Sequence, residues 1–133
     1  MKNGEKCLHG IIQIGDFDER FNVPIEMWSI PDYKRQWREG IERFLAGEIS
    51  SCLVVGMRNP LRGVFINTWS MYVDREQVVF QNQILLCKQI RRRFTGHNFY
   101  DFIEPRETQT EDGEPISEWT VCRNAIVEYL KSL

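Results

Sequence analysis

Apolar and polar residues alternate near the start of the chain in a way that predicts two neighbouring strands. Residues 8–15 (LHGIIQIG) have the pattern of a strand, and residues 21–28 (FNVPIEMW) are expected to form a returning strand. The polar run DFDER at residues 16–20 lies between them and is predicted to be the turn. Pro24 lacks a backbone N–H, so it restricts the second strand to a sheet edge or a bulge.

The next segment has the period of an amphipathic helix. Ser29 or Asp32 can cap its N-terminus, Pro31 suits the first turn, and Gly47 ends it. Gly40 weakens the helix interior by up to about 1 kcal/mol relative to Ala, and it allows another backbone to come close. The apolar residues recur at helical spacing and form one stripe: Tyr33, Trp37, Ile41, Phe44 and Leu45.

Strand patterns dominate the middle of the chain. Residues 50–57 form a near-continuous apolar run, which is typical of a central strand. Residues 64–73 and 78–86 follow, and the short polar run DREQ between them predicts a hairpin. We expect a short helix or loop at 88–94, mostly loop at 98–119 with a strand resuming at 115–121, and a closing helix at 123–133.

These elements together predict an α+β fold. We expect a single domain over residues 1–133, with a mostly antiparallel, curved sheet. The amphipathic helix in the N-terminal half and the C-terminal helix are expected to pack on that sheet. A chain of 133 residues is one domain by the usual prior, and it buries about two-thirds of the surface that the unfolded chain exposes.

The composition is that of a globular protein with a substantial core, at 42% hydrophobic and 27% charged residues. No stretch approaches the roughly 18 uninterrupted apolar residues of a membrane span, and the N-terminus lacks the apolar core of a signal peptide. The four cysteines (Cys7, Cys52, Cys87 and Cys122) lack the close spacing of zinc or redox pairs. We therefore expect reduced thiols and a cytoplasmic protein, with two disulfides as the alternative.

The charge is concentrated in one segment, residues 98–119. It carries seven carboxylates against the single base Arg106, a local net charge of about −6 in a chain whose formal total is −2. A concentrated acidic segment attracts cations, metals or a basic protein, and it repels the phosphate backbone of nucleic acids.

Motifs that would carry catalysis are missing from the sequence: it contains no P-loop, GxGxxG, GxSxG or HExxH. His9 and His97 could form an acid–base pair for phosphodiester cleavage, but nothing in their spacing ties them together. Residues 110–114 (TEDGE) lack the ligand pattern of a calcium loop. We accordingly expect no catalytic residues, no metal and no cofactor. A solvated acidic loop without any partner remains an alternative, and the run Arg91, Arg92 and Arg93 leaves nucleic-acid contact open.

The order of motifs resembles that of the CdiI-type immunity proteins of bacterial contact-dependent growth inhibition systems, over residues 33–121. The most specific part is the string FI-x-PR-x-T-x-x-EDG-x-x-ISEW, which is too long for chance agreement. Phe99 and Arg58 depart from the pattern, and the first 28 residues match nothing in it. The matching positions are Trp37, Phe44-Leu45-x-Gly47, Ser51, Leu53, Val54, Met57, Asn59-Pro60, Phe65, Trp69, Met71-Tyr72, Val79-x-Gln81-Asn82, Phe94, Asn98, Tyr100-Asp101-Phe102-Ile103, Pro105-Arg106, Thr108, Glu111-Asp112-Gly113 and Ile116-Ser117-Glu118-Trp119.

The resemblance implies a non-catalytic protein that binds the C-terminal toxin domain of a cognate CdiA effector, in a 1:1 complex, and blocks it by occlusion. Such toxins are frequently nucleases, with RNase the leading expectation and DNase the next. The charge of residues 98–119 agrees with this implication, because an acidic loop can enter the cationic cleft of a nuclease and exclude its substrate.

The predicted partner-binding residues follow from the acidic segment. Tyr100 is predicted to be an aromatic anchor, while Phe99, Phe102 and Trp119 are expected to belong to the core. Arg91–Arg93 and the unmatched N-terminal hairpin remain further candidate contact surfaces. The carboxylates expected to supply the complementary charge are Asp101, Glu104, Glu107, Glu111, Asp112 and Glu114.

A second hypothesis is a small hydrolase or nucleic-acid-binding module that uses His97 with nearby carboxylates such as Asp101, or the arginine run. It predicts phosphodiester cleavage or salt-dependent RNA binding by this chain alone. The first hypothesis predicts instead no direct contact with nucleic acid or membrane, and tight binding to another protein.

Overall fold

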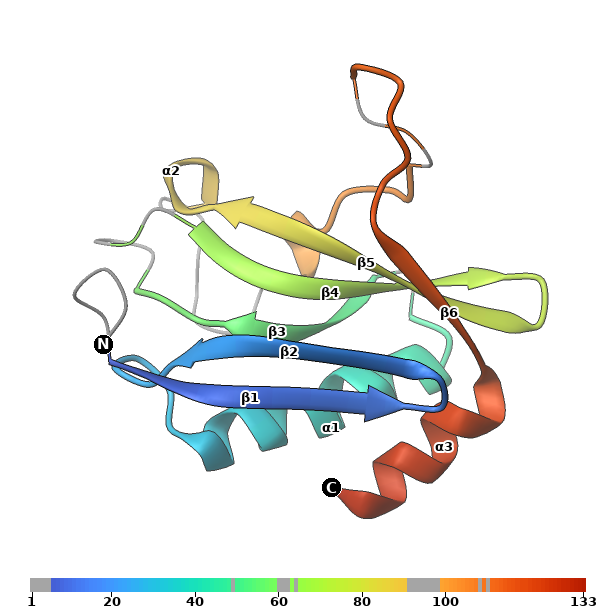
Figure 1. The fold of residues 1–133 in the computed structure, drawn as a ribbon, viewed down its shortest axis with the longest axis horizontal. Coiled ribbons are helices and arrows are strands. Elements are labelled where there is room, and N and C mark those ends of the chain that lie inside the picture. Colours follow the sequence, from blue (N-terminus) through green and yellow to red (C-terminus); the bar gives the residue numbers. More distant parts are fainter. Residues whose placement is uncertain are drawn as a thin grey trace.

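The computed structural model describes residues 6–48, 50–59, 63, 65–90, 99–107, 109 and 111–133, with only the backbone described at Ile90 and Phe99. A four-stranded antiparallel sheet in the order β3-β4-β5-β6 lies against a separate two-stranded sheet, β1-β2 (Figure 1). The fold is α+β, as predicted, but with two sheets where one was expected. The elements are β1 (Cys7–Ile14), β2 (Phe17–Pro24), α1 (Ile30–Leu45), β3 (Ser51–Gly56), β4 (Phe65–Asp74), β5 (Gln77–Leu86), α2 (Cys87–Ile90), the 3-10 turn η1 (Phe99–Phe102), β6 (Glu118–Cys122) and α3 (Arg123–Ser132).

The β1–β2 hairpin corrects one prediction. The polar run at residues 16–20 was predicted to be the turn, but the turn is Gly15-Asp16, and β2 begins at Phe17. Gly15 has a φ of +58°. Two-residue hairpin turns need a positive φ, which glycine adopts more easily than other residues. Phe17 is 1% exposed and its neighbour Asp18 is exposed, so this run alternates between core and solvent as a half-buried strand does.

The four-stranded sheet has two different faces. Its front face, toward the β1–β2 hairpin, holds the main apolar core, in which Phe17 packs on Trp69 and Phe80 with ring centroids 5.0 and 5.2 Å apart. Its back face is apolar near Ile66 and Leu85, and polar where Thr68, Ser70, Gln81 and Gln83 follow one another on β4 and β5. The residues that follow η1 lie over this polar part.

Helix α1 lies against β3, and its position follows from four residues that the sequence analysis singles out. Ser29 forms a capping box with Asp32, and the chain leaves the helix through Gly47, whose φ is +88°. Gly40 faces β3 so closely that a Cβ there would lie 2.2 Å from the carbonyl oxygen of Cys52. The predicted close approach of another backbone at Gly40 is therefore confirmed.

Side chains of α1 also satisfy the backbone of β3. Gln36 Nε2 donates to Cys52 O at 2.9 Å, and Gln36 Oε1 accepts from the Val54 N–H at 2.7 Å. Trp37 Nε1 donates to Val54 O at 2.7 Å. These bonds replace the neighbouring strand that β3 lacks at its outer edge, and an edge satisfied by side chains cannot pair with another chain.

The C-terminal part follows the prediction with shifted bounds. Strand β6 begins at Glu118, three residues later than expected; among the described residues just before it, Gln109 and Pro115 form an isolated bridge rather than a strand. Helix α3 follows at once and buries Ile126 against the front core. Within the described residues, no helix is long and apolar enough to cross a membrane.

Candidate partner-binding surface

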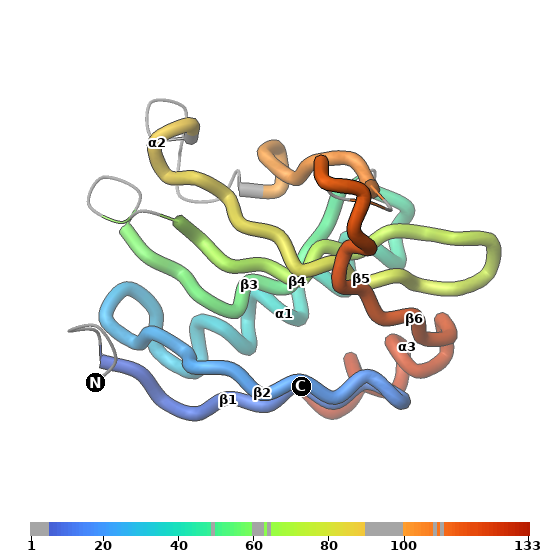
Figure 2. Tube along the Cα trace, turned by 45° about the horizontal axis from the view of Figure 1, so that its top comes forward, coloured from blue at the N-terminus to red at the C-terminus, as the bar shows by residue number. Residues whose placement is uncertain are grey.

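The acidic segment lies on the back face of the sheet, on the side away from the β1–β2 hairpin (Figure 2). It begins with η1, crosses β4 and β5, and returns to the sheet as β6. Carboxylates repel one another and prefer water, so a segment this acidic needs specific bonds to stay in one place. The structure supplies them at four points.

The first point is Tyr100, the residue predicted to be an aromatic anchor. Its side chain is only 3% exposed and lies in the back-face apolar cluster. Its hydroxyl accepts from Gln36 Nε2 at 3.1 Å, and the Arg43 guanidinium lies 4.0 Å above its ring. Burial raises the pKa of its phenol. In this conformation Tyr100 fixes the start of the loop from inside, so the ring offers no exposed contact.

The second and third points are amide and hydroxyl groups on β4 and β5. Tyr72 donates its hydroxyl hydrogen to Glu104 O at 2.5 Å, and Gln83 Nε2 donates to the Tyr72 hydroxyl. One row along the sheet, Gln81 Nε2 donates to Glu107 O at 2.5 Å. The loop is therefore held by its backbone carbonyls, which leaves the side chains of Glu104 and Glu107 exposed to solvent.

The fourth point is Arg106, the base within the acidic segment. Its guanidinium forms ion pairs with Asp74 at 3.1 Å and with Glu118 at 3.0 Å. Glu118 also accepts from Gln81 Nε2 at 2.9 Å. The Arg106 bond, and then the Gln81 bond, hold the pKa of the Glu118 carboxyl below its usual value. Glu118 is thus an internal counter-ion of the loop.

The tip of the segment stands away from the sheet (Figure 1). The Gln109–Pro115 bridge closes it, and Gly113 has the left-handed φ of +83°. We call residues 109–115 the acidic tip; its three carboxylates, Glu111, Asp112 and Glu114, are exposed. The six predicted binding carboxylates therefore all reach solvent, three at the tip and three at its base (Asp101, Glu104 and Glu107).

Sequence reasoning missed the residues that position this loop. Tyr72, Gln81, Arg106 and Glu118 belong to the motif string that resembles a known family, so a signal existed, but it did not say that these residues contact one another. Gln81, which is 2% exposed, and the half-buried Glu118 are hydrogen-bonded to each other. Phe102 packs on the back-face cluster as expected, whereas Trp119 is 38% exposed.

Most residues of the alternative hypothesis fall where the structure gives no description. His97 and Arg91–Arg93 lie outside the described residues. Across the described ranges, no three His, Cys, Asp or Glu side chains come close enough together to hold a metal ion. Cys52 and Cys87 are buried among apolar side chains, Cys7 is partly exposed and Cys122 is exposed.

Comparison with known proteins adds to this geometry. Residues 23–129 match the family described as the CdiI N-terminal domain. The immunity protein CdiI of Enterobacter cloacae is 34% identical over 130 residues, which are 98% of this chain and 89% of that protein. The structure is similar to a chain of the CdiA-CT/CdiI toxin and immunity complex from Enterobacter cloacae, with a TM-score of 0.87 and 32% identity, over 99% of this chain and 90% of that one.

Proposed function

The chain belongs to the CdiI family of immunity proteins, and we propose that it binds and neutralises the C-terminal toxin domain of a cognate CdiA effector. One observation carries the proposal: nearly the whole chain matches, in sequence and in fold, a chain from a toxin and immunity complex. A single 1–133 domain acting in the cytoplasm as a 1:1 inhibitor, without catalysis of its own, fits this role.

The acidic segment suggests how neutralisation works. Six exposed carboxylates lie on one loop whose backbone is fixed at Glu104 and Glu107 and whose base is fixed by Arg106. A fixed array of negative charge attracts a basic surface over a distance and loses little conformational entropy on binding. We propose that the tip of this array occupies a cationic active site that would otherwise hold phosphate, which makes a nuclease the expected toxin and an RNase the favoured one.

The test is co-expression of the cognate CdiA C-terminal domain with this protein. We expect wild-type protein to restore growth, and the triple reversal Glu111→Lys, Asp112→Lys and Glu114→Lys to reduce protection. With purified proteins, the reversal should lower the association rate by about 10-fold or more and weaken its dependence on salt. The buried area of the wild-type complex should be about 1,200–2,000 Å².

The matched control reverses three exposed carboxylates elsewhere, Asp16→Lys, Asp18→Lys and Glu76→Lys, with the same change in net charge. It should associate with the toxin faster than the tip variant does. If cells die equally fast with and without wild-type protein, the immunity function is wrong. If wild type protects and both triple variants bind alike, the function stands and the electrostatic mechanism is wrong. Assays of the toxin domain on RNA and on DNA then identify the activity that is blocked.

A further inference from the structure

The front face of the four-stranded sheet is only partly covered. Phe17 of the β1–β2 hairpin covers Trp69 and Phe80, both of which are at most 3% exposed. Farther along the same strands the cover ends, and Ile84 is 55% and Leu86 43% exposed. These residues continue the β-sheet pairing with β4, since Asn67 lies opposite Ile84 and Phe65 opposite Leu86.

Two further side chains on this face are near the exposed area: Phe65 lies opposite Leu86, and Trp119 lies opposite Phe80, with the exposed Asn82 between Phe80 and Ile84 on β5. Trp119 on β6 is 38% exposed while its ring lies 5.3 Å from that of Phe17. Phe65 is half-buried beneath the Arg58 guanidinium, which lies 4.6 Å above its ring. We call Phe65, Ile84, Leu86 and Trp119 the front strip. A strip of large apolar side chains on a sheet face marks an interaction surface, and Trp, Phe and Arg are the residues that interfaces favour.

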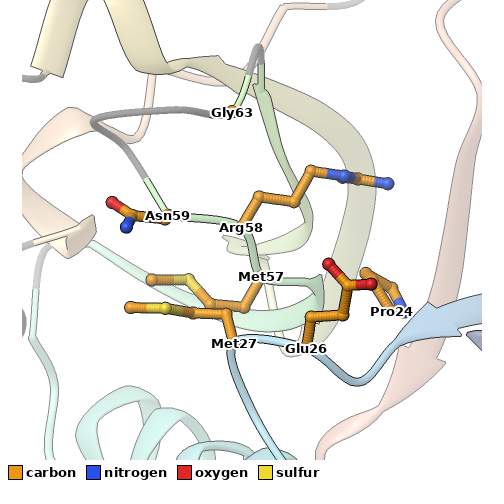
Figure 3. A pocket seen from close by; sticks show the side chains of 7 residues that line it. All are labelled: Pro24, Glu26, Met27, Met57, Arg58, Asn59 and Gly63. Carbon is orange, nitrogen blue, oxygen red and sulfur yellow. The ribbon is translucent and has the colours of Figure 1, made fainter. Parts of the chain in front are cut away.

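The front strip continues into a pocket of about 370 Å³ beside Arg58. Met27, 45% exposed, and the buried Met57 line it together with Glu26. Figure 3 shows the two methionine side chains extending in the same direction and Arg58 extending away from them. A flexible, polarizable pocket next to a flat apolar strip can receive a protruding side chain of a partner.

The acidic tip identifies the kind of partner. The pairing of β5 with β6 ends at Gln81 and Glu118, so the chain just before Trp119 leaves the sheet and leads to the tip. Figure 1 shows the tip rising from the start of β6, next to β5. A second copy of this chain docked face to face would bring two such tips together, and like charges at an interface oppose binding. A basic partner meets no such opposition.

We propose that the front strip is the apolar centre of the toxin interface and that the acidic tip is its charged rim. This inference rests on the proposed function and names the surface that performs it. The two parts then have separate tasks: the tip sets how fast the basic toxin domain arrives, and the strip, which is shielded from water in the complex, sets how slowly it leaves.

The experiment measures association and dissociation rates of the purified toxin domain on wild type and on the double variant Ile84→Ser, Leu86→Ser. Dissociation should be about 10-fold faster or more, with the association rate changed by less than about 2-fold. Val73→Ser is the matched control, because Val73 is 65% exposed on the same face at the opposite end of β4. It should leave both rates unchanged.

Thermal unfolding checks that the exposed substitutions leave the fold intact. If wild type binds the toxin domain and the double variant dissociates at the wild-type rate, the front strip is not the interface, and the immunity function still stands. If wild type forms no complex, the proposed function and this inference both fail. If wild type alone is a dimer by light scattering and the double variant is a monomer, a second copy occupies the strip and the inference is overturned.

Discussion

Two buried glutamines form the same kind of side-chain hydrogen bonds in different parts of the molecule. Gln36, 5% exposed on α1, joins its side-chain amide to the backbone of β3 at Cys52 and Val54. Gln81, 2% exposed on β5, joins its amide to the loop at Glu107 and to the carboxylate of Glu118. In both places a side-chain amide supplies a hydrogen bond that no neighbouring strand supplies.

The difference lies in what each amide holds. The partners of Gln36 are the backbone of β3, in which every residue is buried, and the buried Tyr100, so water cannot replace its bonds. The partner of Gln81 is a loop whose side chains face solvent, so water can take over the freed carbonyl. The Gln36 amide therefore stabilises the fold, while the Gln81 amide mainly fixes the position of the acidic loop.

Replacing each glutamine by leucine removes the amide and keeps the approximate volume. Of the substitutions considered, these are expected to show the largest difference in unfolding free energy. Gln36→Leu leaves a buried carbonyl and a buried N–H unpaired, which costs about 2–4 kcal/mol of unfolding free energy. Gln81→Leu costs about 1 kcal/mol, because only one end of each lost bond is buried. Urea denaturation of both variants measures the difference.

Hydrogen exchange separates the two roles. Gln81→Leu should speed amide exchange in residues 103–107 and leave β3 unchanged, because the loop opens locally while the core stays folded. Gln36→Leu should lower protection across β3 and α1. Equal losses of stability in the two variants would contradict the distinction between a glutamine of the fold and a glutamine of the loop.

A smaller effect is expected at Gly40, where two forces oppose each other. Alanine favours the helix by about 1 kcal/mol over glycine. The added Cβ, however, would lie 2.2 Å from the Cys52 carbonyl oxygen, a backbone atom that cannot move alone. Overpacking of this kind costs about 1–3 kcal/mol, so Gly40→Ala should destabilise the fold by a net amount of up to about 2 kcal/mol.

Gly47→Ala provides a comparison of a different kind, since a Cβ there meets no atom within 4 Å and the cost comes from the left-handed φ alone. Urea denaturation of both variants is the measurement. A stabilised Gly40→Ala protein would show that α1 can move away from β3 freely, and that the Gln36 bonds do not fix their separation.

The α1–β3 region is also where the sequence was most informative. The close approach at Gly40 could be predicted because glycine has no Cβ. The N-terminal cap and the apolar stripe could be predicted, because each depends on residues near one another in the chain. The β4–β5 hairpin was predictable for the same reason. The β1–β2 turn could not be predicted in the same way. Residues 16–20 are mostly polar and were therefore assigned to the turn, but Phe17 among them is buried through contacts with Trp69 and Phe80, far along the chain.

The same limit applies to the candidate site. Its charge could be predicted from composition, but the burial of Tyr100 depends on Gln36, 64 positions away. The role of Arg106 depends on Asp74 and Glu118, which meet only after the sheet has formed. Exposure of Ile84 and Leu86 depends on how far the β1–β2 hairpin reaches, and no local pattern encodes that distance.

The smallest expected effect concerns pH at the base of the loop. Because Arg106 and Gln81 lower the pKa of Glu118 in the folded protein, its ion pair stabilises the fold above the unfolded-state value of about 4.3. That stabilisation is lost as the pH falls through the lower, folded pKa. A partly exposed pair of this kind contributes about 0.2–1 kcal/mol.

Glu118→Gln should therefore be slightly less stable than wild type at pH 7, and the gap in unfolding free energy should close below about pH 4. Urea denaturation at pH 7, 5 and 3.5 measures the gap, with Glu76→Gln, in the exposed β4–β5 turn, as the control. A gap that stays constant over this range would mean that the Glu118 carboxylate does not hold the loop through its charge.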